Sequence, residues 1–261
     1  MDINTILRSA ILNNLNFFLA LIVFIVVVNL LRTPMVKGLI GEAIIKVLAK
    51  LKLPKAIYVP IHNVTLPTSD GTTQIDHIFV SKFGVFVVET KNMKGWIFGS
   101  EKQAQWTQQI YKVKNRFQNP LHQNYKHVKT LESALDIPAD SIKSVIAFTG
   151  SGTIKTEMPK NVTHGIGYVR YIKSFTDPIL TDNQVLQIVE KIRTGRLEPS
   201  RATNKEHIQN LENRKNLNTK KACPKCGKPM VLRTAKKGET RGNQFWGCSG
   251  FPTCRTVQAI T

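Results

Sequence analysis

Three ionisable residues interrupt an otherwise apolar stretch of sequence, "QIDHIFVSKFGVFVVETKN", at residues 74–92. They are Asp76, Glu89 and Lys91, and buried strands normally exclude such charges. If residues 81–84 form a four-residue turn between two antiparallel strands, Asp76 lies directly opposite Glu89. Opposed side chains share one face of the sheet, with their Cβ atoms about 5 Å apart. The spacing therefore predicts a pair of carboxylates with a lysine beside it.

This arrangement suggests a specific chemistry. Two carboxylates held so close raise each other's pKa unless a cation lies between them. A divalent ion that prefers oxygen ligands and waters, Mg²⁺ or Mn²⁺, is the expected occupant. Lys91, two residues beyond Glu89 on the same face, can offset charge, position a water or hold a phosphate oxygen. Water activated by a metal, with cationic help at the transition state, can hydrolyse phosphodiesters.

The prediction depends on the strand register. A turn one residue longer sets Asp76 opposite Thr90 and turns its side chain to the other face. An acid followed two residues later by lysine is also common where an apolar strand emerges into water, which is the structural alternative. In a regular strand His77 faces away from Asp76, and we expect a packed, hydrogen-bonded histidine there.

Around this stretch the chain resembles the nuclease-related (NERD) domain, a branch of the PD-(D/E)xK nuclease superfamily. The matching segments, within about residues 36–150, are Gly41-Glu42, "QIDHIFV" at 74–80, "GVFVVETKN" at 84–92, Gly95 and "NPLHQNYKHV" at 119–128. The resemblance implies an α/β (α+β) fold with a restriction-endonuclease-like core, a mixed β-sheet flanked by helices. It also implies catalytic roles: Asp76 and Glu89 hold the metal, Lys91 is the catalytic lysine, and Glu42 on a helix completes the site.

A polar pair follows on the helix expected to begin at Asn119 and Pro120. Gln123 and His127 are four residues apart and therefore share one helical face. Related nucleases carry a polar pair on such a helix near the active site. The alternative is a polar stripe that faces solvent.

The remaining sequence patterns indicate the elements that position these residues. Apolar periodicity, caps and Pro or Gly boundaries predict the following elements: helix 37–53, strand 56–66, the hairpin 74–92, a short strand at 96–98, helix 119–135, strands 142–150 and 164–171, and helix 181–195. This gives four segments: an anchor at 1–35, a nuclease-related domain at 36–196 with its core at 36–150, a basic linker at 197–221, and a zinc ribbon at 222–261.

The N-terminal segment has no charged residue from Ser9 to Leu31. As a helix, 23 residues span about 35 Å, enough to cross a bilayer core of about 30 Å. We expect one transmembrane helix at residues 9–31; a buried core helix is the alternative. Basic residues follow the segment, so the positive-inside rule places the C-terminal bulk in the cytoplasm. The expected location is the bacterial inner (cytoplasmic) membrane, crossed once.

All four cysteines lie in the last 39 residues of the chain. Cys223 and Cys226 form a C-x2-C pair; 21 residues later Cys248 and Cys254 form a C-x5-C pair. Two close thiolate pairs match a tetrahedral structural Zn²⁺ site, which also supplies folding energy to a segment too small for a core. Two disulfides are the alternative, which the expected cytoplasmic location disfavours.

The run from Cys223 to Cys254 resembles the C-terminal zinc ribbon of bacterial type I topoisomerases. It contains "GNQFWGC" at 242–248 and "FPTC" at 251–254. The resemblance implies binding of single-stranded DNA; protein contacts are the alternative. Residues whose chemistry suits that role are Arg233, Lys236, Lys237, Arg241, Phe245 and Trp246. Phe245 and Trp246 face opposite ways in a strand, and the sequence does not say which of them meets the ligand.

The overall charge agrees with a polyanionic partner. The chain carries 37 Lys and Arg against 17 Asp and Glu, a formal net charge of +20. The sequence therefore predicts a membrane-anchored protein that binds DNA and hydrolyses phosphodiesters with Mg²⁺ or Mn²⁺. The alternative is a non-catalytic nucleic-acid-binding or partner-docking module at the membrane.

Overall fold

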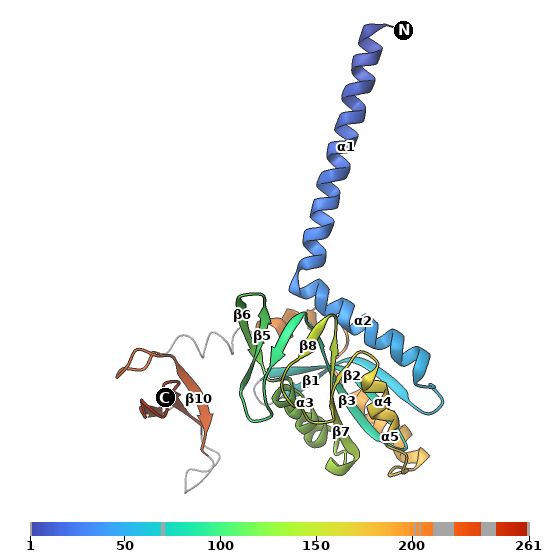
Figure 1. Cartoon of the computed structure of the whole chain (residues 1–261). Coiled ribbons are helices and arrows are strands. Elements are labelled where there is room, and N and C mark those ends of the chain that lie inside the picture. Colours follow the sequence, from blue (N-terminus) through green and yellow to red (C-terminus); the bar gives the residue numbers. More distant parts are fainter. Residues whose placement is uncertain are drawn as a thin grey trace. The chain divides into compact units, whose positions relative to one another are not determined.

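The computed structural model describes residues 2–68, 71–200, 202–203, 205–210, 222–235 and 244–259 (Figure 1). The chain divides into two compact units. The first comprises Met1–Leu66 with Gln74–Arg196, and the second comprises Pro67–Thr73 with Leu197–Thr261.

Two helices open the first unit, α1 at Ile3–Arg32 and α2 at Pro34–Lys52. Thr33 separates them and caps α2, because its side chain accepts a hydrogen bond from the Val36 N–H. In the described part of the chain, no helix is by itself long and apolar enough to cross a membrane. Phe17–Arg32 and Pro34–Lys52 meet that requirement only as a pair, bent by 70° at their junction. The single span expected at residues 9–31 therefore stays a prediction.

A five-stranded mixed sheet forms the centre of the first unit. Its order is β1-β2-β3-β7-β9; β2 and β3 are antiparallel, whereas β3, β7 and β9 are parallel. The strands are β1 at Val59–Thr68, β2 at Gly71–Ser81, β3 at Gly84–Asn92, β7 at Ile142–Thr149 and β9 at Val162–His164.

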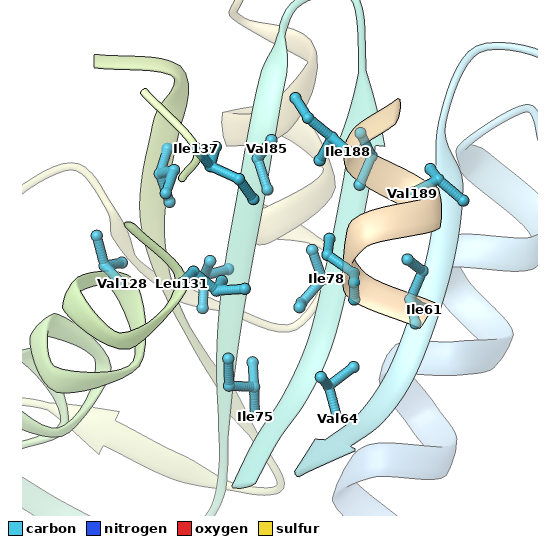
Figure 2. Close-up of a cluster of buried hydrophobic side chains, with 14 of the residues drawn as sticks. Ile61, Val64, Ile75, Ile78, Val85, Val128, Leu131, Ile137, Ile188 and Val189 are labelled. Atoms are coloured by element: carbon cyan, nitrogen blue, oxygen red, sulfur yellow. The ribbon is translucent and has the colours of Figure 1, made fainter. Parts of the chain in front are cut away.

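Helices cover both faces of this sheet. Figure 2 shows one face, where α3 (Pro120–Leu135) and α5 (Asp182–Gly195) bury their apolar side chains against β1, β2 and β3. On the other face α2 and α4 (Gly167–Lys173) pack against Phe79, Phe86 and Val88. Val85 and Val87 point to the first face and Phe86 and Val88 to the second, as the strand repeat requires. The predicted mixed sheet flanked by helices is confirmed.

A second sheet extends the unit, with order β6-β5-β4-β8. Its strands are β4 at Gly95–Phe98, β5 at Gln105–Ile110, β6 at Val113–Gln118 and β8 at Gly152–Ile154. Trp106 is fully buried here and stacks on Phe148. The sequence predicted only the first of these strands, because β5 and β6 are too polar to show a clear apolar alternation.

The strand predicted at residues 164–171 is wrong. β9 ends at His164, and Gly165, with φ of 55°, turns the chain into α4. Tyr168 and Ile172 lie one helical turn apart, so both side chains reach the same core face. The Tyr168 hydroxyl also donates a hydrogen bond to the Ile45 carbonyl of α2 at 2.7 Å. Packing against the sheet therefore outweighs the strand propensity of the aromatic and β-branched residues in this segment, which forms a helix.

The described C-terminal strands form a three-stranded antiparallel sheet with order β10-β11-β12. They are β10 at Met230–Thr234, β11 at Gln244–Cys248 and β12 at Val257–Ala259. Within the expected linker, residues 205–210 are helical.

Candidate functional site

The strand pairing around the acidic residues follows the four-residue turn. Ser81 pairs with Gly84, and the same register continues to His77 opposite Val88. Asp76 and Glu89 follow directly after this last pair on their two strands, and the Glu89 charge acts on the Asp76 carboxyl group. The Asp76 Oδ2 accepts a hydrogen bond from the Thr90 N–H at 2.9 Å, which fixes the carboxyl group at the end of the hairpin.

Glu89 is enclosed between two cationic or polar partners from different elements. Its side chain is only 2% exposed; Lys91 Nζ lies 2.6 Å from Oε1, and His127 Nε2 lies 3.2 Å from Oε2. Burial alone would raise the pKa of Glu89, but Lys91 and His127 outweigh burial and hold that pKa below its usual value. Glu89 is therefore a carboxylate in the folded protein, with both oxygens oriented.

Helix α3 supplies a second partner for both Glu89 and Lys91. Lys91 Nζ donates a hydrogen bond to Gln123 Oε1 at 2.9 Å. Asn124, between the two polar residues, donates to the Val87 carbonyl at 2.9 Å and so fixes α3 to the sheet. Gln123 and His127 thus face the site, and the alternative of a solvent-facing stripe is wrong.

Two further carboxyl groups, those of Asp76 and Glu42, lie near Glu89 and Lys91. Burial, the neighbouring Glu89 and also Glu42 raise the pKa of Asp76 well above its usual value, and the Thr90 N–H and Lys91 offset this only in part. Burial raises the pKa of Glu42 as well, although Lys46 Nζ, at 3.8 Å, counteracts it. Three acids that affect one another's ionisation are therefore gathered by α2, β2 and β3.

The position of Glu42 depends on the glycine before it. A Cβ on Gly41 would lie 2.8 Å from Asn92 Cβ and 2.9 Å from Thr149 Oγ1. Only a glycine therefore lets α2 approach the ends of β3 and β7 this closely. Asn92 also links β3 to α2, because its Nδ2 donates a hydrogen bond to the Lys37 carbonyl at 2.7 Å.

The donor set suits an oxygen-preferring divalent cation. Asp76 uses Oδ2 for the Thr90 N–H, which leaves Oδ1 for a ligand. Burial and, to a smaller extent, repulsion between the carboxylates raise the pKa of Asp76 and Glu42, and a bound cation would relieve that repulsion. The three carboxyl groups are less tightly gathered than the cysteines below, which in the described residues form the one metal-ligand cluster with all donors within 4.8 Å. A cation here would thus keep several waters, as Mg²⁺ commonly does.

The four cysteine sulfurs converge at one end of the three-stranded sheet, where β10 begins, β11 ends and β12 begins. Cys223 Sγ lies 3.7 Å from Cys254 Sγ, and Cys226 Sγ lies 3.4 Å from Cys248 Sγ, with no disulfide among them. The Gly250 N–H approaches Cys248 Sγ at 3.2 Å, and the Thr256 hydroxyl approaches Cys254 Sγ at 3.3 Å. Such contacts orient thiolate ligands, so the cluster has the composition and the supporting hydrogen bonds of a structural Zn²⁺ site.

Comparison with known proteins agrees with both sites. The family model described as "Nuclease-related domain" matches residues 37–149, and the model described as "Topoisomerase DNA binding C4 zinc finger" matches residues 220–261. An uncharacterized protein of Bacillus anthracis is 42% identical over 189 residues, which cover 70% of this chain and 87% of that protein. The chain belongs to the nuclease-related domain family. No solved structure matches it.

The two aromatic residues of β11, Phe245 and Trp246, lie in different surroundings on the zinc ribbon. Trp246 packs against the cluster formed by the cysteines and Met230. Phe245 instead lines a cavity of about 170 Å³ on the ribbon, together with Arg233 and Phe251. The Arg233 guanidinium lies 5.8 Å from the centre of the Phe251 ring. An aromatic and cationic surface of this kind can stack a nucleobase and hold its phosphate.

Phe251 and Arg255, which also line that cavity, were not among the predicted nucleic-acid contacts. They flank the last cysteine, where the sequence shows only a ligand motif. Lys236, Lys237 and Arg241 lie outside the described residues.

In this member of the nuclease-related domain family, the histidine beside Asp76 has a partner from β1. His77 is fully buried, and its Nδ1 lies 2.9 Å from Nδ1 of His62. Burial lowers the pKa of His77 to about 3 and that of His62 to about 4. The expectation of a packed histidine that faces away from the acids is confirmed. A cavity of about 300 Å³ beside this pair is lined by His62 and Lys46 rather than by the acidic group.

Proposed function

We propose that this protein binds nucleic acid through its zinc ribbon and hydrolyses phosphodiester bonds at the group formed by Glu42, Asp76, Glu89 and Lys91. The observation that carries the proposal is the placement of Lys91. Its ammonium group is held by Glu89 at 2.6 Å and by Gln123 at 2.9 Å, next to Asp76 and Glu42, whose pKa values are raised by burial and by the neighbouring carboxylates. A purely structural ion pair would not need two further buried acids beside it.

The residues divide the chemistry among them. When bound, Mg²⁺ or Mn²⁺ would lower the pKa of a water molecule and neutralise charge on the phosphate. Asp76 and Glu89 would hold the ion, with Glu42 assisting from α2. Lys91 Nζ would orient the attacking water or stabilise the negative charge that develops on the phosphate. Gln123 and His127 keep Lys91 and Glu89 in place.

The ribbon would supply binding to single-stranded DNA. Its support is the cavity that brings Phe245 and Phe251 together with Arg233 and Arg255. Stacking on aromatics tolerates any base, and the arginines hold the backbone, so sequence-independent binding is expected.

A cleavage assay with the full chain in detergent tests the catalytic part. We expect cleavage of DNA with Mg²⁺ or Mn²⁺, lost by about 10²-fold or more in Lys91→Ala and in Asp76→Ala, because each removes a charge used in the transition state. Lys94→Ala, an exposed lysine nearby, is the matched control and should cleave normally. Cleavage that survives both site substitutions would refute the proposed site.

The second candidate is a non-catalytic nucleic-acid-binding or docking module, favoured by the net charge of +20 and the separate ribbon. It predicts DNA binding without cleavage under all metal conditions, with no effect of Lys91→Ala on affinity. Measuring binding and cleavage on the same samples decides between the two.

We further propose that α1 anchors the protein in the bacterial cytoplasmic membrane, with the C-terminal bulk in the cytoplasm. The support is the exposed apolar surface of α1, where side chains such as Phe17, Phe24 and Leu30 are more than half exposed. Resistance of the full chain to alkaline extraction from membranes tests this. Release into the soluble fraction would refute it.

A further inference from the structure

Helix α2 has an apolar stripe on the side opposite to its core contacts. Gly41, Ile45 and Ala49 face the sheet and are buried. Ile40, Ile44, Val47 and Leu51 follow the spacing of one helical face, and their exposures are 40%, 37%, 56% and 69%. An exposed stripe of four aliphatic residues is unusual on a helix that is already packed on its other side.

Basic residues flank this stripe. Among the residues of α2, Glu42 is the one acid, against Lys37, Lys46, Lys50 and Lys52. Lys50 and Lys52 are exposed, and Lys55 follows just after the helix end. Aliphatic side chains bordered by lysines match a surface that meets apolar chains beneath a layer of negative charge.

The stripe also continues an apolar surface. Helix α1, whose described side chains from Phe17 to Leu31 are mostly exposed and aliphatic or aromatic, ends just before α2 begins. The two axes meet at 70° at Thr33, and α2 runs on from that bend in Figure 1. If α1 crosses a bilayer along its normal, this bend leaves α2 about 20° from the bilayer plane.

We propose that the outer face of α2, the stripe of Ile40, Ile44, Val47 and Leu51 with its flanking lysines, lies on an anionic lipid bilayer. The proposal rests on the membrane attachment proposed for α1. By the helical repeat, Glu42 lies almost on the opposite side of α2 from the stripe. The same helix would then hold the acidic group on the side away from the lipid, facing the aqueous phase where nucleic acid is found.

Photo-crosslinking of the full chain in nanodiscs tests this. A benzoylphenylalanine replaces Val47 or Leu51 in the stripe, Phe24 in α1, or Tyr125, which is 60% exposed on α3, across the sheet from α2, and serves as the control. We expect phospholipid adducts, identified by mass, at positions 24, 47 and 51 and none at position 125.

The lipid composition tests the role of charge. In discs that contain phosphatidylglycerol the adduct yield at positions 47 and 51 should exceed that in phosphatidylcholine alone. Each lysine that reaches an anionic surface contributes about fivefold to partitioning. Lys50→Gln with Lys52→Gln should lower this yield in anionic discs, whereas the exposed pair Lys126→Gln with Lys129→Gln on α3, across the sheet from α2, should leave it unchanged.

The outcomes separate the two proposals. Lipid adducts at position 24 without any at 47 and 51 would overturn the role of α2 and leave the anchor intact. Adducts at 47 and 51 that join two copies of the protein would overturn it as well and assign the stripe to self-association. Adducts at 47 and 51 but not at 24 would support α2 and refute the anchor, and adducts at none of the three would refute both.

Discussion

Glu89 shows at the residue scale how the chain keeps a charge inside a sheet. An unpaired carboxylate with 2% exposure would be very costly, and Glu89 is instead contacted by Lys91 on its own strand and His127 on α3. For Asp76, the Thr90 N–H and Lys91 do not outweigh burial and the neighbouring acids, so its pKa rises. The pKa of Glu89 is lowered, whereas that of Asp76 is raised. An added cation would stabilise the charged form of Asp76, so this difference favours a cation site.

The two aromatics of β11 should separate in function. Phe245→Ala is expected to weaken single-stranded DNA binding by about 1–3 kcal/mol, since one stacking surface is removed, while zinc is retained. Trp246→Ala should instead destabilise the ribbon, because that side chain packs on the cysteine cluster. Fluorescence anisotropy with labelled DNA and zinc analysis measure the two effects. Equal loss of affinity with intact zinc in both variants would contradict this assignment.

The pair of His62 and His77 predicts a dependence of stability on pH. Their pKa values in the fold are about 4 and about 3, below the usual 6.5. Below pH 6.5 the unfolded chain takes up protons that the folded chain does not bind, so stability falls as the pH drops from 6.5 towards 4. Each such proton steepens the fall by at most about 1.4 kcal/mol per pH unit.

His62→Gln should therefore lose less stability than the parent between pH 7 and pH 5. Urea unfolding at several pH values measures this, and the parent and the variant carry the same ribbon, so their difference isolates the histidine pair. His122→Gln, at an exposed histidine of α3, is the control. Parallel pH profiles of the parent and His62→Gln would contradict the prediction.

At the scale of elements, α2 must approach the sheet closely enough to deliver Glu42. Gly41→Ala places a Cβ 2.8 Å from Asn92 Cβ and 2.9 Å from Thr149 Oγ1, so overpacking should cost about 1–3 kcal/mol. It should also reduce cleavage, because α2 moves outward together with Glu42.

Gly38 offers a matched control on the same helix. A Cβ there would meet nothing within 4 Å, so Gly38→Ala should stabilise the protein by about 0.5–1 kcal/mol through helix propensity. Thermal unfolding of the two variants measures the contrast. If Gly41→Ala were as stable as Gly38→Ala, the close approach of α2 would be refuted.

The elements also show how far sequence reasoning reaches. The hairpin register followed from local chemistry, because Ser81 to Gly84 form a tight turn and both strands are strongly apolar. The N-cap of α3 at Asn119 and the capping box of α5 at Thr181 were equally local signals. The sequence did not predict helix α4, because this helix is stabilised by packing against α2 and the sheet, which are distant in the sequence.

The residues of the site also divide into those that local sequence signals predict and those that depend on long-range packing. Asp76, Glu89 and Lys91 are close in sequence or joined by one turn, so their meeting could be predicted. Their interactions with His127 and Gln123 depend on how α3 docks, which Asn124 fixes through hydrogen bonds to β3 and β7. The outward position of the α2 stripe likewise appears only once the buried face of that helix is known.

At the scale of the whole molecule, the proposed binding site and the proposed cleavage site belong to different units of the chain. The acidic group lies in the first unit and the cysteine cluster in the second. A zinc ribbon of about forty residues draws its folding energy from the metal, whereas the first unit has its own apolar cores. Damage to the ribbon should therefore leave the first unit folded.

Cys223→Ser combined with Cys226→Ser tests this separation. We expect loss of bound zinc and of ribbon structure, a higher KM for single-stranded DNA, and an unchanged kcat at saturating substrate, because the ribbon concentrates DNA without touching the reacting phosphate. The salt dependence of binding should also become shallower, by about 0.7 in the log–log slope for each phosphate that the ribbon no longer neutralises. Lys91→Ala should show the reverse, with kcat lost and binding kept. If the double variant lost kcat as well, the ribbon would have to take part in the cleavage step, and the division of labour between the two units would be refuted.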